Sequence, residues 1–297
     1  MIGLSNEKHV LALSDEFLAD VLRGDDDASR AFEKAASEQL AAVDFTTLDL
    51  AGHCANYQEF KAACTRVASA LGALMAQNDD GATLIEVYDR QIGRIEEGVR
   101  YHQTRQGGDI HTDSVNRPEP MRYLVLGSAA AAVVGGESIL VRARDVVARL
   151  AETAPEVLAT LRAPFWFEGR GMSDDMHLFQ LPVLSGPDDA PVFRYLRPYI
   201  TSAHDRAGAP LTPDQIYAFD ALDAIIEMSD MQHRVMLEQG MVLLATDTAV
   251  FHGRPSFVDG ARPGAWVPGR LTLRSRVQCP TRLAALQLGA RGSYLAA

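Results

Sequence analysis

The sequence predicts a mainly β fold with helical additions, a double-stranded β-helix of the jelly-roll type. From about residue 99 onward, short β-type runs are broken by Gly, Pro and Asp, as around residues 123–126 (YLVL), 138–141 (SILV) and 241–244 (MVLL). Helical patterns occupy the first hundred residues and a few stretches between these runs. Many short strands, with helices confined to additions and insertions, are typical of a jelly roll.

We expect one domain over residues 1–297, because a chain of this length can form a single large β-rich unit. Residues 1–98 are expected to form a mostly helical N-terminal portion, and residues 99–283 the jelly-roll core. An insertion around residues 142–240 is expected to interrupt that core and to contain a lid.

The clearest helix of the N-terminal portion begins at residues 56–59 (NYQE), which have the form of a capping box. Apolar residues then recur at helical spacing: Phe60, Cys64, Val67, Leu71 and Leu74. This spacing predicts a helix that packs on the outside of the sheet. Acidic turns are expected at residues 24–27 and 78–81.

Two helices are expected inside the insertion. Residues 145–161 contain Val147, Leu150 and Leu158 in a helical stretch. Residues 212–215 (TPDQ) begin the second helix, because Thr followed by Pro and an acidic residue is typical of a helix N-terminus.

Composition restricts the partners of the chain. Hydrophobic residues make up 47% and charged residues 23%, which is ordinary for a globular protein. The formal net charge of −11 argues against nucleic acid or an anionic membrane as partner, because both require a basic face. We therefore expect a small-molecule substrate, with no nucleic acid and no membrane.

We expect a cytoplasmic protein, because the sequence shows the pattern of neither a membrane span nor a signal peptide. No apolar run approaches the ~18 residues of a membrane span, and the start MIGLSNEKHV lacks a basic region followed by an apolar one. Cys54, Cys64 and Cys279 are odd in number and lack C-x-x-C spacing, so neither a zinc site nor a disulfide framework is predicted. We expect three reduced thiols in a cytoplasmic protein.

The sequence His111-Thr112-Asp113 is the strongest chemical feature. Residues two apart project to the same side of a strand, as two ligands of one metal ion require. About 140 residues later, His252 follows a run that would place it inside a barrel. Two histidines and one carboxylate form the facial triad of non-haem Fe(II) oxygenases, which leaves coordination positions open. The alternative is a strand-end histidine beside a turn aspartate.

Downstream of His252, Arg270, Thr272 and Arg274 alternate with Leu271 and Leu273. On a strand, this alternation gives one polar and one apolar face. Two inward guanidinium groups are costly to bury unless anions neutralise them, and their planar forks match carboxylates. The row is therefore expected to line a cavity that receives carboxylates. The alternative is an edge strand that faces solvent.

Four motifs together resemble a known family: HTDS (111–114), GGES (135–138), FHGRPSF (251–257) and RLTLR (270–274). Over roughly residues 98–283, the chain resembles the taurine dioxygenase and clavaminate synthase-like branch of the iron(II)/2-oxoglutarate-dependent oxygenases. The resemblance implies three sets of site residues: iron ligands His111, Asp113 and His252; 2-oxoglutarate ligands Ser138 and Arg270; and a substrate-facing Arg274.

One departure affects the two arginines. The spacing from His252 to Arg270 is 18 residues, longer than in most relatives, because of the insertion at residues 262–269. The sequence therefore leaves open whether Arg270 or Arg274 binds the distal carboxylate of 2-oxoglutarate.

The resemblance also implies a reaction with Fe(II) as cofactor and 2-oxoglutarate and O2 as cosubstrates. Oxidative decarboxylation to succinate and CO2 would accompany hydroxylation of an unactivated C–H bond. Halogenating relatives have a small residue at the position of Asp113, so the aspartate favours oxidation without halide. Two other interpretations remain: an iron oxygenase that does not use 2-oxoglutarate, and a barrel that binds a ligand without catalysis.

The expected substrate is a small carboxylate-bearing metabolite. An amino acid or amino-acid derivative of specialised metabolism is the first choice, and a sulfonate or other small acid is the second. Besides Arg274, Arg170 and Arg197 are candidate substrate ligands, because they lie in a segment rich in polar and aromatic side chains. Residues 169–175 are expected to form a mobile lid. The alternatives are a solvated insertion there and a lid at residues 114–120.

Overall fold

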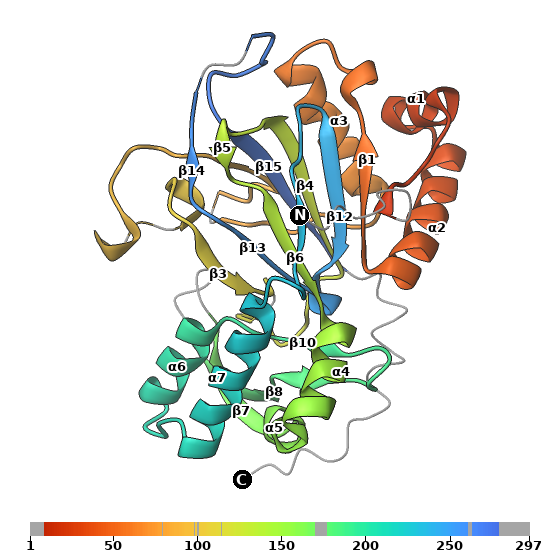
Figure 1. The fold of residues 1–297 in the computed structure, drawn as a ribbon. Helices are drawn as coiled ribbons and strands as arrows, with labels where there is room; N and C mark the ends of the chain where they lie inside the picture. Colours follow the sequence, from red (N-terminus) through yellow and green to blue (C-terminus); the bar gives the residue numbers. More distant parts are fainter. Residues whose placement is uncertain are drawn as a thin grey trace.

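Two antiparallel sheets face each other and form the jelly-roll core predicted from the sequence (Figure 1). The structure is a computed structural model that describes residues 9–78, 80–97, 99, 101–113, 115–169, 177–260 and 263–278. In spatial order, the five-stranded sheet consists of β1 (Phe45–Asp49), β12 (Met241–Thr246), β4 (Tyr123–Ala130), β15 (Leu271–Val277) and β2 (Leu84–Val87). The four-stranded sheet consists of β11 (His233–Val235), β6 (Ser138–Arg142), β13 (Val250–Arg254) and β3 (Gly108–His111).

Smaller pairs of strands extend this core. They are β5 (Val134–Gly135) with β14 (Phe257–Val258), β7 (Pro164–Glu168) with β8 (Leu178–Pro182), and β9 (Leu184–Ser185) with β10 (Val192–Phe193). Strands β1 and β2 come from the N-terminal portion and form the two edges of the five-stranded sheet. The sequence patterns did not predict these two strands.

Apolar side chains from both sheets meet in the interior. Leu243 and Ala245 of β12 pack there with Leu140 of β6 and Val250 of β13. Neighbouring residues of β12 point to the opposite face, since side chains alternate along a strand. This alternation separates an inner layer between the sheets from an outer layer under the helices.

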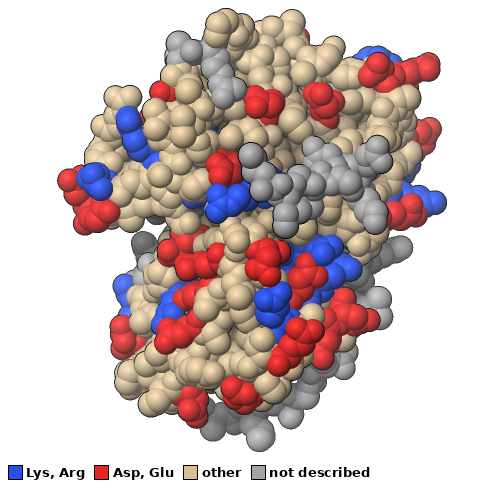
Figure 2. Space-filling view, in the orientation of Figure 1, with Lys and Arg blue, Asp and Glu red and all other residues tan. Residues whose placement is uncertain are grey.

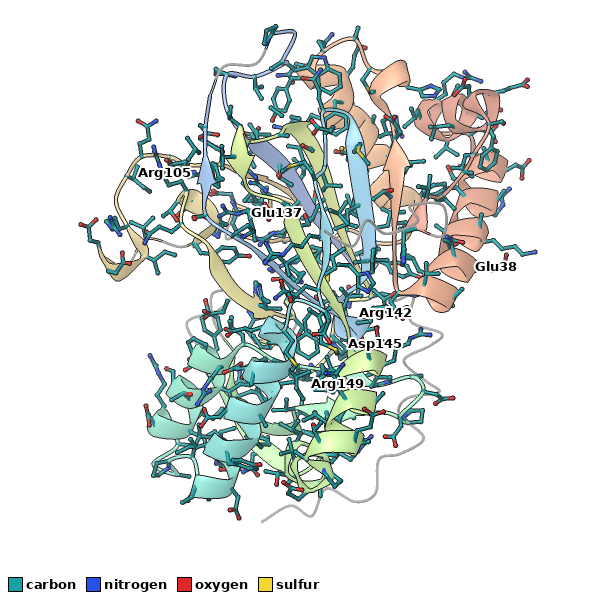
Figure 3. The ribbon with its side chains drawn as sticks, viewed as in Figure 1. Glu38, Arg105, Glu137, Arg142, Asp145 and Arg149 are labelled. Carbon is teal, nitrogen blue, oxygen red and sulfur yellow. The ribbon has the colours of Figure 1, made fainter. Side chains whose placement is uncertain are left out.

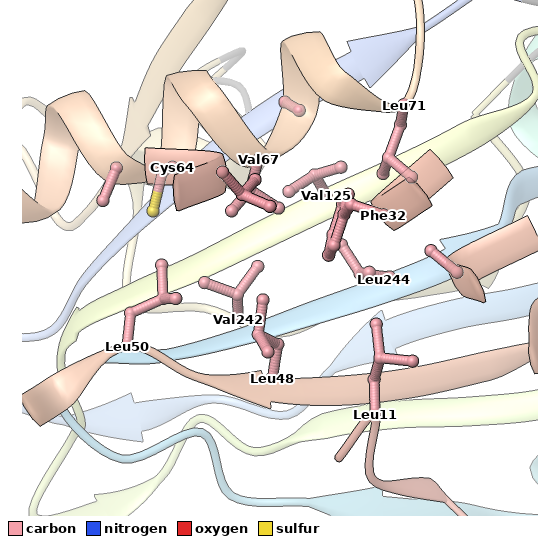
Figure 4. Close-up of a cluster of buried hydrophobic side chains, with 14 of the residues drawn as sticks. Leu11, Phe32, Leu48, Leu50, Cys64, Val67, Leu71, Val125, Val242 and Leu244 are labelled. Atoms are coloured by element: carbon pink, nitrogen blue, oxygen red, sulfur yellow. The ribbon is translucent and has the colours of Figure 1, made fainter. Parts of the chain in front are cut away.

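Three helices cover the outer face of the five-stranded sheet (Figure 1): α1 (Asp15–Arg23), α2 (Asp26–Val43) and α3 (Tyr57–Ala70). Phe32 of α2 and Val67 of α3 belong to the same buried cluster as Val125, Val242 and Leu244 of the sheet (Figure 4). The predicted packing of the helix at residues 57–70 on the outside of the sheet is confirmed.

Side chains cap the N-termini of two of these helices by local hydrogen bonds. Asp25 accepts from the backbone N–H of Ala28 at 2.8 Å, and Asn56 accepts from that of Glu59 at 3.0 Å. The Glu59 carboxylate accepts from the backbone N–H of Ala55, one residue before the cap, rather than from that of Asn56. The cap at Asn56 therefore differs from a strict capping box by one residue.

The segment between β6 and β11 contains a second group of helices (Figure 1): α4 (Ala143–Thr153), α5 (Pro155–Leu161), α6 (Arg197–Arg206) and α7 (Pro213–Glu227). The helix expected over residues 145–161 is divided at Ala154, because Pro155 cannot continue a helix but suits its first turn. The capping box that begins α7 is present: Thr212 and Gln215 exchange both hydrogen bonds.

The α4 helix follows β6 directly. Arg142, the last residue of β6, donates from Nε to Asp145 Oδ2 at 2.7 Å across this junction (Figure 3). The α4, α5 and α7 helices share a buried apolar cluster with Phe165, Phe193 and Phe251. The four-stranded sheet therefore packs on the helical group through Phe251 of β13. That the whole chain forms one domain stays a prediction.

Acidic and basic side chains intermingle on the face shown in Figure 2. Among the described residues, no helix combines the length and apolar character needed to cross a membrane. Cys54 and Cys64 are buried and free, and burial raises the pKa of Cys54 to about 11. Cys279 lies outside the described residues.

Gly127 of β4 faces α3, and it provides a test of the outer layer. A Cβ atom there would collide with Cys64 Sγ and lie 3.1 Å from Phe60 Cζ. We expect Gly127→Ala to lower the free energy of unfolding by about 1–3 kcal/mol through overpacking, measured by urea denaturation. A second change, Cys64→Ala, should recover part of this loss. Gly52→Ala is the control, since no heavy atom lies within 4 Å of its Cβ position; equal losses at both glycines would contradict the packing.

Candidate active site

The structure brings His111, Asp113 and His252 together. His252 of β13 lies directly opposite His111 of the antiparallel neighbour β3, and their ring centroids are 4.5 Å apart. The Asp113 carboxylate lies 3.7 Å from His111 Nε2 and 4.0 Å from His252 Nε2. The three candidate ligand atoms all lie within 4.8 Å of one another. This cluster could hold a metal ion.

Thr112 keeps the two residues beside it on the same side, although β3 ends at His111. Its backbone N–H donates to Tyr195 O at 2.9 Å, and its hydroxyl accepts from the Tyr195 backbone N–H at 2.9 Å. These bonds fix the backbone just past the end of the strand, where Asp113 begins a turn. The Asp113 carboxylate nevertheless lies beside the His111 ring, as the alternation of side chains predicts for residues two apart.

A hydrogen bond orients one imidazole toward the cluster, and burial disfavours the charged form of the other. His111 Nδ1 lies 2.7 Å from the backbone oxygen of Asp109, so a proton on Nδ1 leaves the Nε2 lone pair directed at the cluster. Burial and the adjacent His111 lower the pKa of His252 to about 3. Neutral imidazole is the form that binds a metal ion.

Asp113 is held by an arginine that the sequence reasoning missed. Arg276 donates from Nη2 to Asp113 Oδ1 at 2.7 Å and from Nε to Oδ2 at 3.1 Å. Burial alone would raise the pKa of Asp113, but Arg276 and the other cations nearby hold it well below its usual range. Asp247 accepts from the Asp113 backbone N–H at 2.9 Å. The only sequence cue was that Arg276 extends the alternation of Arg270, Thr272 and Arg274 by one step.

The predicted alternation along β15 is confirmed. Leu273 is buried among the helices on the outer face, and Leu271 packs against the same cluster. Arg274 pairs with Leu126 of β4, which packs into the inner layer. The basic side chains of β15 therefore point between the two sheets.

Arg270 lies just before β15 in a largely enclosed position. Its Nε donates to Gly136 O at 3.3 Å, and its guanidinium carbon lies 5.1 Å from the Phe257 ring centroid. Its Nη1 is buried without a hydrogen-bond partner among the described residues. Burial, together with Arg254, lowers the pKa of Arg270 to about 9. A buried guanidinium with an unused donor is suited to receive an anion.

The GGES motif forms the wall beside this guanidinium. Gly136 has φ 76°, and a Cβ there would lie 3.0 Å from Arg270 Nε, so this position requires glycine. Ser138 begins β6 two residues later and is buried. On β6, Ser138 shares a face with Leu140, which lies opposite His252.

The insertion that lengthens the spacing from His252 to Arg270 packs on the helical layer. Its Trp266 ring lies 5.2 Å from that of Phe60, and its backbone N–H donates to Gln239 Oε1 at 2.8 Å. Residues 263–269, the described part of the insertion, are therefore accommodated in a docked loop, and β15 still enters the sheet beside β4.

Arg274 is buried and forms no salt bridge among the described residues. Its Nε donates to Gln77 Oε1 at 2.9 Å, while Gln77 donates back to the Arg274 backbone oxygen at 2.9 Å. Burial and the adjacent Arg276 lower the pKa of Arg274, whereas Asp113 and Tyr101 nearby oppose this shift. No sequence pattern pointed to Gln77, which lies in a loop, or to Tyr101, which begins a 3-10 helix of only three residues.

The other two substrate candidates are not brought into this cluster by any described contact. Arg197 begins α6 and binds Asp223 at 2.6 Å and Asp220 at 2.7 Å, which joins α6 to α7. Its role in substrate binding stays a prediction. Arg170, most of the lid expected at residues 169–175, and Ser114 lie outside the described residues.

The Arg276–Asp113 pair gives a prediction about stability. Arg276→Met leaves Asp113 buried without its cation, which should lower the free energy of unfolding of the metal-free protein by about 3–5 kcal/mol. Added Zn(II) should raise the melting temperature of this variant more than that of the unaltered protein, because the metal replaces the lost cation. The control Arg149→Met removes an exposed pair with Asp230, which is worth about 0–1 kcal/mol. A variant at residue 276 as stable as this control would contradict the prediction.

Comparisons with known proteins agree with this geometry. A curated relative, FR-33289 synthase from Streptomyces rubellomurinus, is 24% identical over 205 residues, which cover 64% of this chain and 55% of the relative. This chain therefore spans about half the length of that relative. Two solved structures share the fold. The non-heme iron oxygenase OrfP in complex with Fe and alpha-ketoglutaric acid has a TM-score of 0.62 at 17% identity, covering 92% of this chain and 95% of that one.

An asparagine oxygenase in complex with Fe(II), 2S,3S-3-hydroxyasparagine and succinate has a TM-score of 0.66 at 14% identity, covering 95% of this chain and 94% of that one. The family model described as "Taurine catabolism dioxygenase TauD, TfdA family" matches residues 18–270, which is most of the chain. This protein belongs to the TauD/TfdA family of dioxygenases.

Proposed function

We propose that this protein is an Fe(II)- and 2-oxoglutarate-dependent oxygenase that hydroxylates an unactivated C–H bond of a small carboxylate-bearing metabolite. The cluster of His111, Asp113 and His252 is the observation that supports this most directly. Two neutral imidazoles and one ionised carboxylate are the donor set of non-haem Fe(II) oxygenases. Fe(II), when bound, supplies the activation of O2 that no protein side chain can provide.

Arg270 would hold the distal carboxylate of 2-oxoglutarate, with Ser138 as a second ligand. The unpartnered Nη1 of Arg270 supports this assignment, because a carboxylate would satisfy that donor and neutralise the buried charge. The Phe257 ring and the Gly136 carbonyl hold the guanidinium in place from two directions.

Arg274 would bind the acidic group of the substrate. Gln77 fixes its Nε, while the rest of the guanidinium has no carboxylate partner among the described residues. Structural relatives were solved with amino acids or their hydroxylated products, namely L-homoarginine and hydroxyasparagine. An amino acid or amino-acid derivative of specialised metabolism is therefore the substrate class we propose. Arg170 and Arg197 remain candidates for further substrate contacts, and a cytoplasmic location stays a prediction.

A sulfonate or another small acid is the second candidate. The family to which the chain belongs is named for taurine catabolism, and Arg274 suits any compact anion. The overall reaction is the same in either case: one O2 oxidises substrate and 2-oxoglutarate together, giving hydroxylated product, succinate and CO2. Because Asp113 supplies a carboxylate ligand, the proposed reaction incorporates no halide.

The first test measures the formation of succinate from 2-oxoglutarate in the presence of Fe(II). Amino acids and small sulfonates are screened for compounds that stimulate this turnover.

Replacing His111, Asp113 or His252 by Ala should abolish turnover and weaken metal binding, because each change removes one ligand of the triad. Circular dichroism should show that the fold largely survives, although Asp113→Ala also leaves Arg276 buried without its carboxylate and should lower the free energy of unfolding. Asp113→Gly should retain two ligands but hydroxylate poorly. Full activity in any alanine variant would rule out the triad.

The two arginines can be separated by kinetics. Arg270→Ala should weaken 2-oxoglutarate binding about 10- to 100-fold, since a charge-assisted pair contributes about 1.5–3 kcal/mol. The same change should leave the binding of the substrate unchanged. Arg274→Ala should weaken the binding of the stimulating substrate and leave the binding of 2-oxoglutarate unchanged. The measurement is the KM of each compound in each variant. If the two phenotypes are exchanged, Arg274 is the ligand of 2-oxoglutarate.

A further inference from the structure

Arg254 is a buried arginine that the proposed reaction does not use. It ends β13 two residues after His252, and 7% of its surface is exposed. It forms no salt bridge among the described residues, although a buried guanidinium is costly to leave without partners. The hydrogen-bond partners of Arg254 therefore indicate its structural role.

The Arg254 guanidinium binds the segment between β2 and β3, whose described residues 88–97, 99 and 101–107 are here called the arm. The arm extends from the body of the molecule (Figure 1; Arg105 is labelled on it in Figure 3). Its Nη2 donates to the backbone oxygens of Gln106 at 2.9 Å and Thr104 at 3.2 Å, and lies 3.4 Å from that of Tyr101. A Cβ at Gly107 would lie 3.0 Å from Arg254 O, so arm and strand are in close contact. Arg254 thus holds the inner end of the arm.

This inner end places Tyr101 beside two groups of the site. The Tyr101 ring meets the His111 ring edge-on at 5.6 Å, and Tyr101 lies near enough to Arg274 to influence the pKa of its guanidinium. Gly108 leaves room for the ring, since a Cβ there would lie 2.9 Å from it. The position of Tyr101 depends on backbone that Arg254 fixes.

Arg254 also contacts the cosubstrate side through Phe257. Its guanidinium carbon lies 4.6 Å from the Phe257 ring centroid, and that of Arg270 lies 5.1 Å from the same centroid. Cation–π contacts of this kind hold a planar guanidinium against a ring. Phe257 is therefore a shared surface on which both arginines are oriented.

We propose that Arg254 is a positioning residue that joins the two halves of the site. Its bonds to the arm place Tyr101 against His111 and Arg274, and its contact with Phe257 helps to orient Arg270. This inference rests on the proposed function for the meaning of Arg270, but the contact with the arm does not. Lysine cannot replace Arg254, because its ammonium ends one bond short of the Nη2 atom that binds the carbonyls and has no planar face to lie on the ring.

The test uses the full chain loaded with Zn(II), so that binding is measured without turnover. For Arg254→Lys we expect hydrogen exchange at residues 101–108 to accelerate about tenfold or more, because the carbonyl contacts are lost. The Kd for 2-oxoglutarate, measured by calorimetry, should rise about 3- to 30-fold through the lost contact with Phe257. If either quantity stays at the value of the unaltered protein, the coupling is wrong.

Phe257→Leu separates the two contacts. It keeps the bonds to the arm, so it should weaken 2-oxoglutarate binding while exchange at residues 101–108 stays unchanged. An unchanged Kd in this variant would overturn the proposal even if Arg254→Lys failed to fold. Arg162→Lys is the matched control, since Arg162 also donates to a backbone carbonyl, that of Gly186, at 2.8 Å on another surface. If the unaltered protein binds no 2-oxoglutarate, the proposed function fails, whereas the exchange experiment still tests the contact with the arm.

Discussion

The antiparallel pairing of β13 with its two neighbours is the constraint on which the site depends. His252 lies opposite His111 on one side and opposite Leu140 on the other, so both neighbours fix the same register. A slip of one residue would turn His252 away from His111, since side chains alternate along a strand. The pairing with β3 shifts register immediately after His252, where Arg254 pairs with Gly108. That irregularity lies where the arm joins the sheet.

The interior of the barrel combines an apolar layer with an unusual amount of positive charge. Arg276 is neutralised by Asp113, whereas Arg270 and Arg274 are buried with hydrogen bonds but no salt bridge among the described residues. Burial of such cations opposes folding unless anions reach them. An anionic cosubstrate and an anionic substrate would relieve that opposition, so ligand binding and stability are expected to be coupled in this fold.

Several residues of the site act by positioning the residues that would contact the metal ion or the substrates. Thr112 is bonded to Tyr195 and keeps Asp113 in place, Gln77 holds Arg274, and Arg254 holds the arm. Each of these contacts uses backbone carbonyls or amides as well as side chains. A site built in this way keeps its geometry before the metal ion and cosubstrates bind, which is what positioning of reactants requires.

Periodicity and local motifs were enough to predict the jelly-roll class, the outer helix at residues 57–70 and the inward row of β15. These features depend on the alternation of neighbouring residues or on capping within one turn, which a sequence displays directly. The same rule of residues two apart suggested that His111 and Asp113 face one ion. The prediction of one helical stretch over residues 145–161 rested on apolar spacing alone and did not take Pro155 into account, which begins a new helix.

Only the tertiary structure decided the partners of the buried charges. Arg276 meets Asp113 from 163 residues away, and Arg274 meets Gln77 from 197 residues away. The edge strands β1 and β2 likewise pair with strands far along the chain, β12 and β15 respectively. By itself, the sequence determined which residue types could bind a metal ion and which faces of the strands they occupy. Which cation meets which carboxylate depended on strand order and loop docking, which no local pattern encodes.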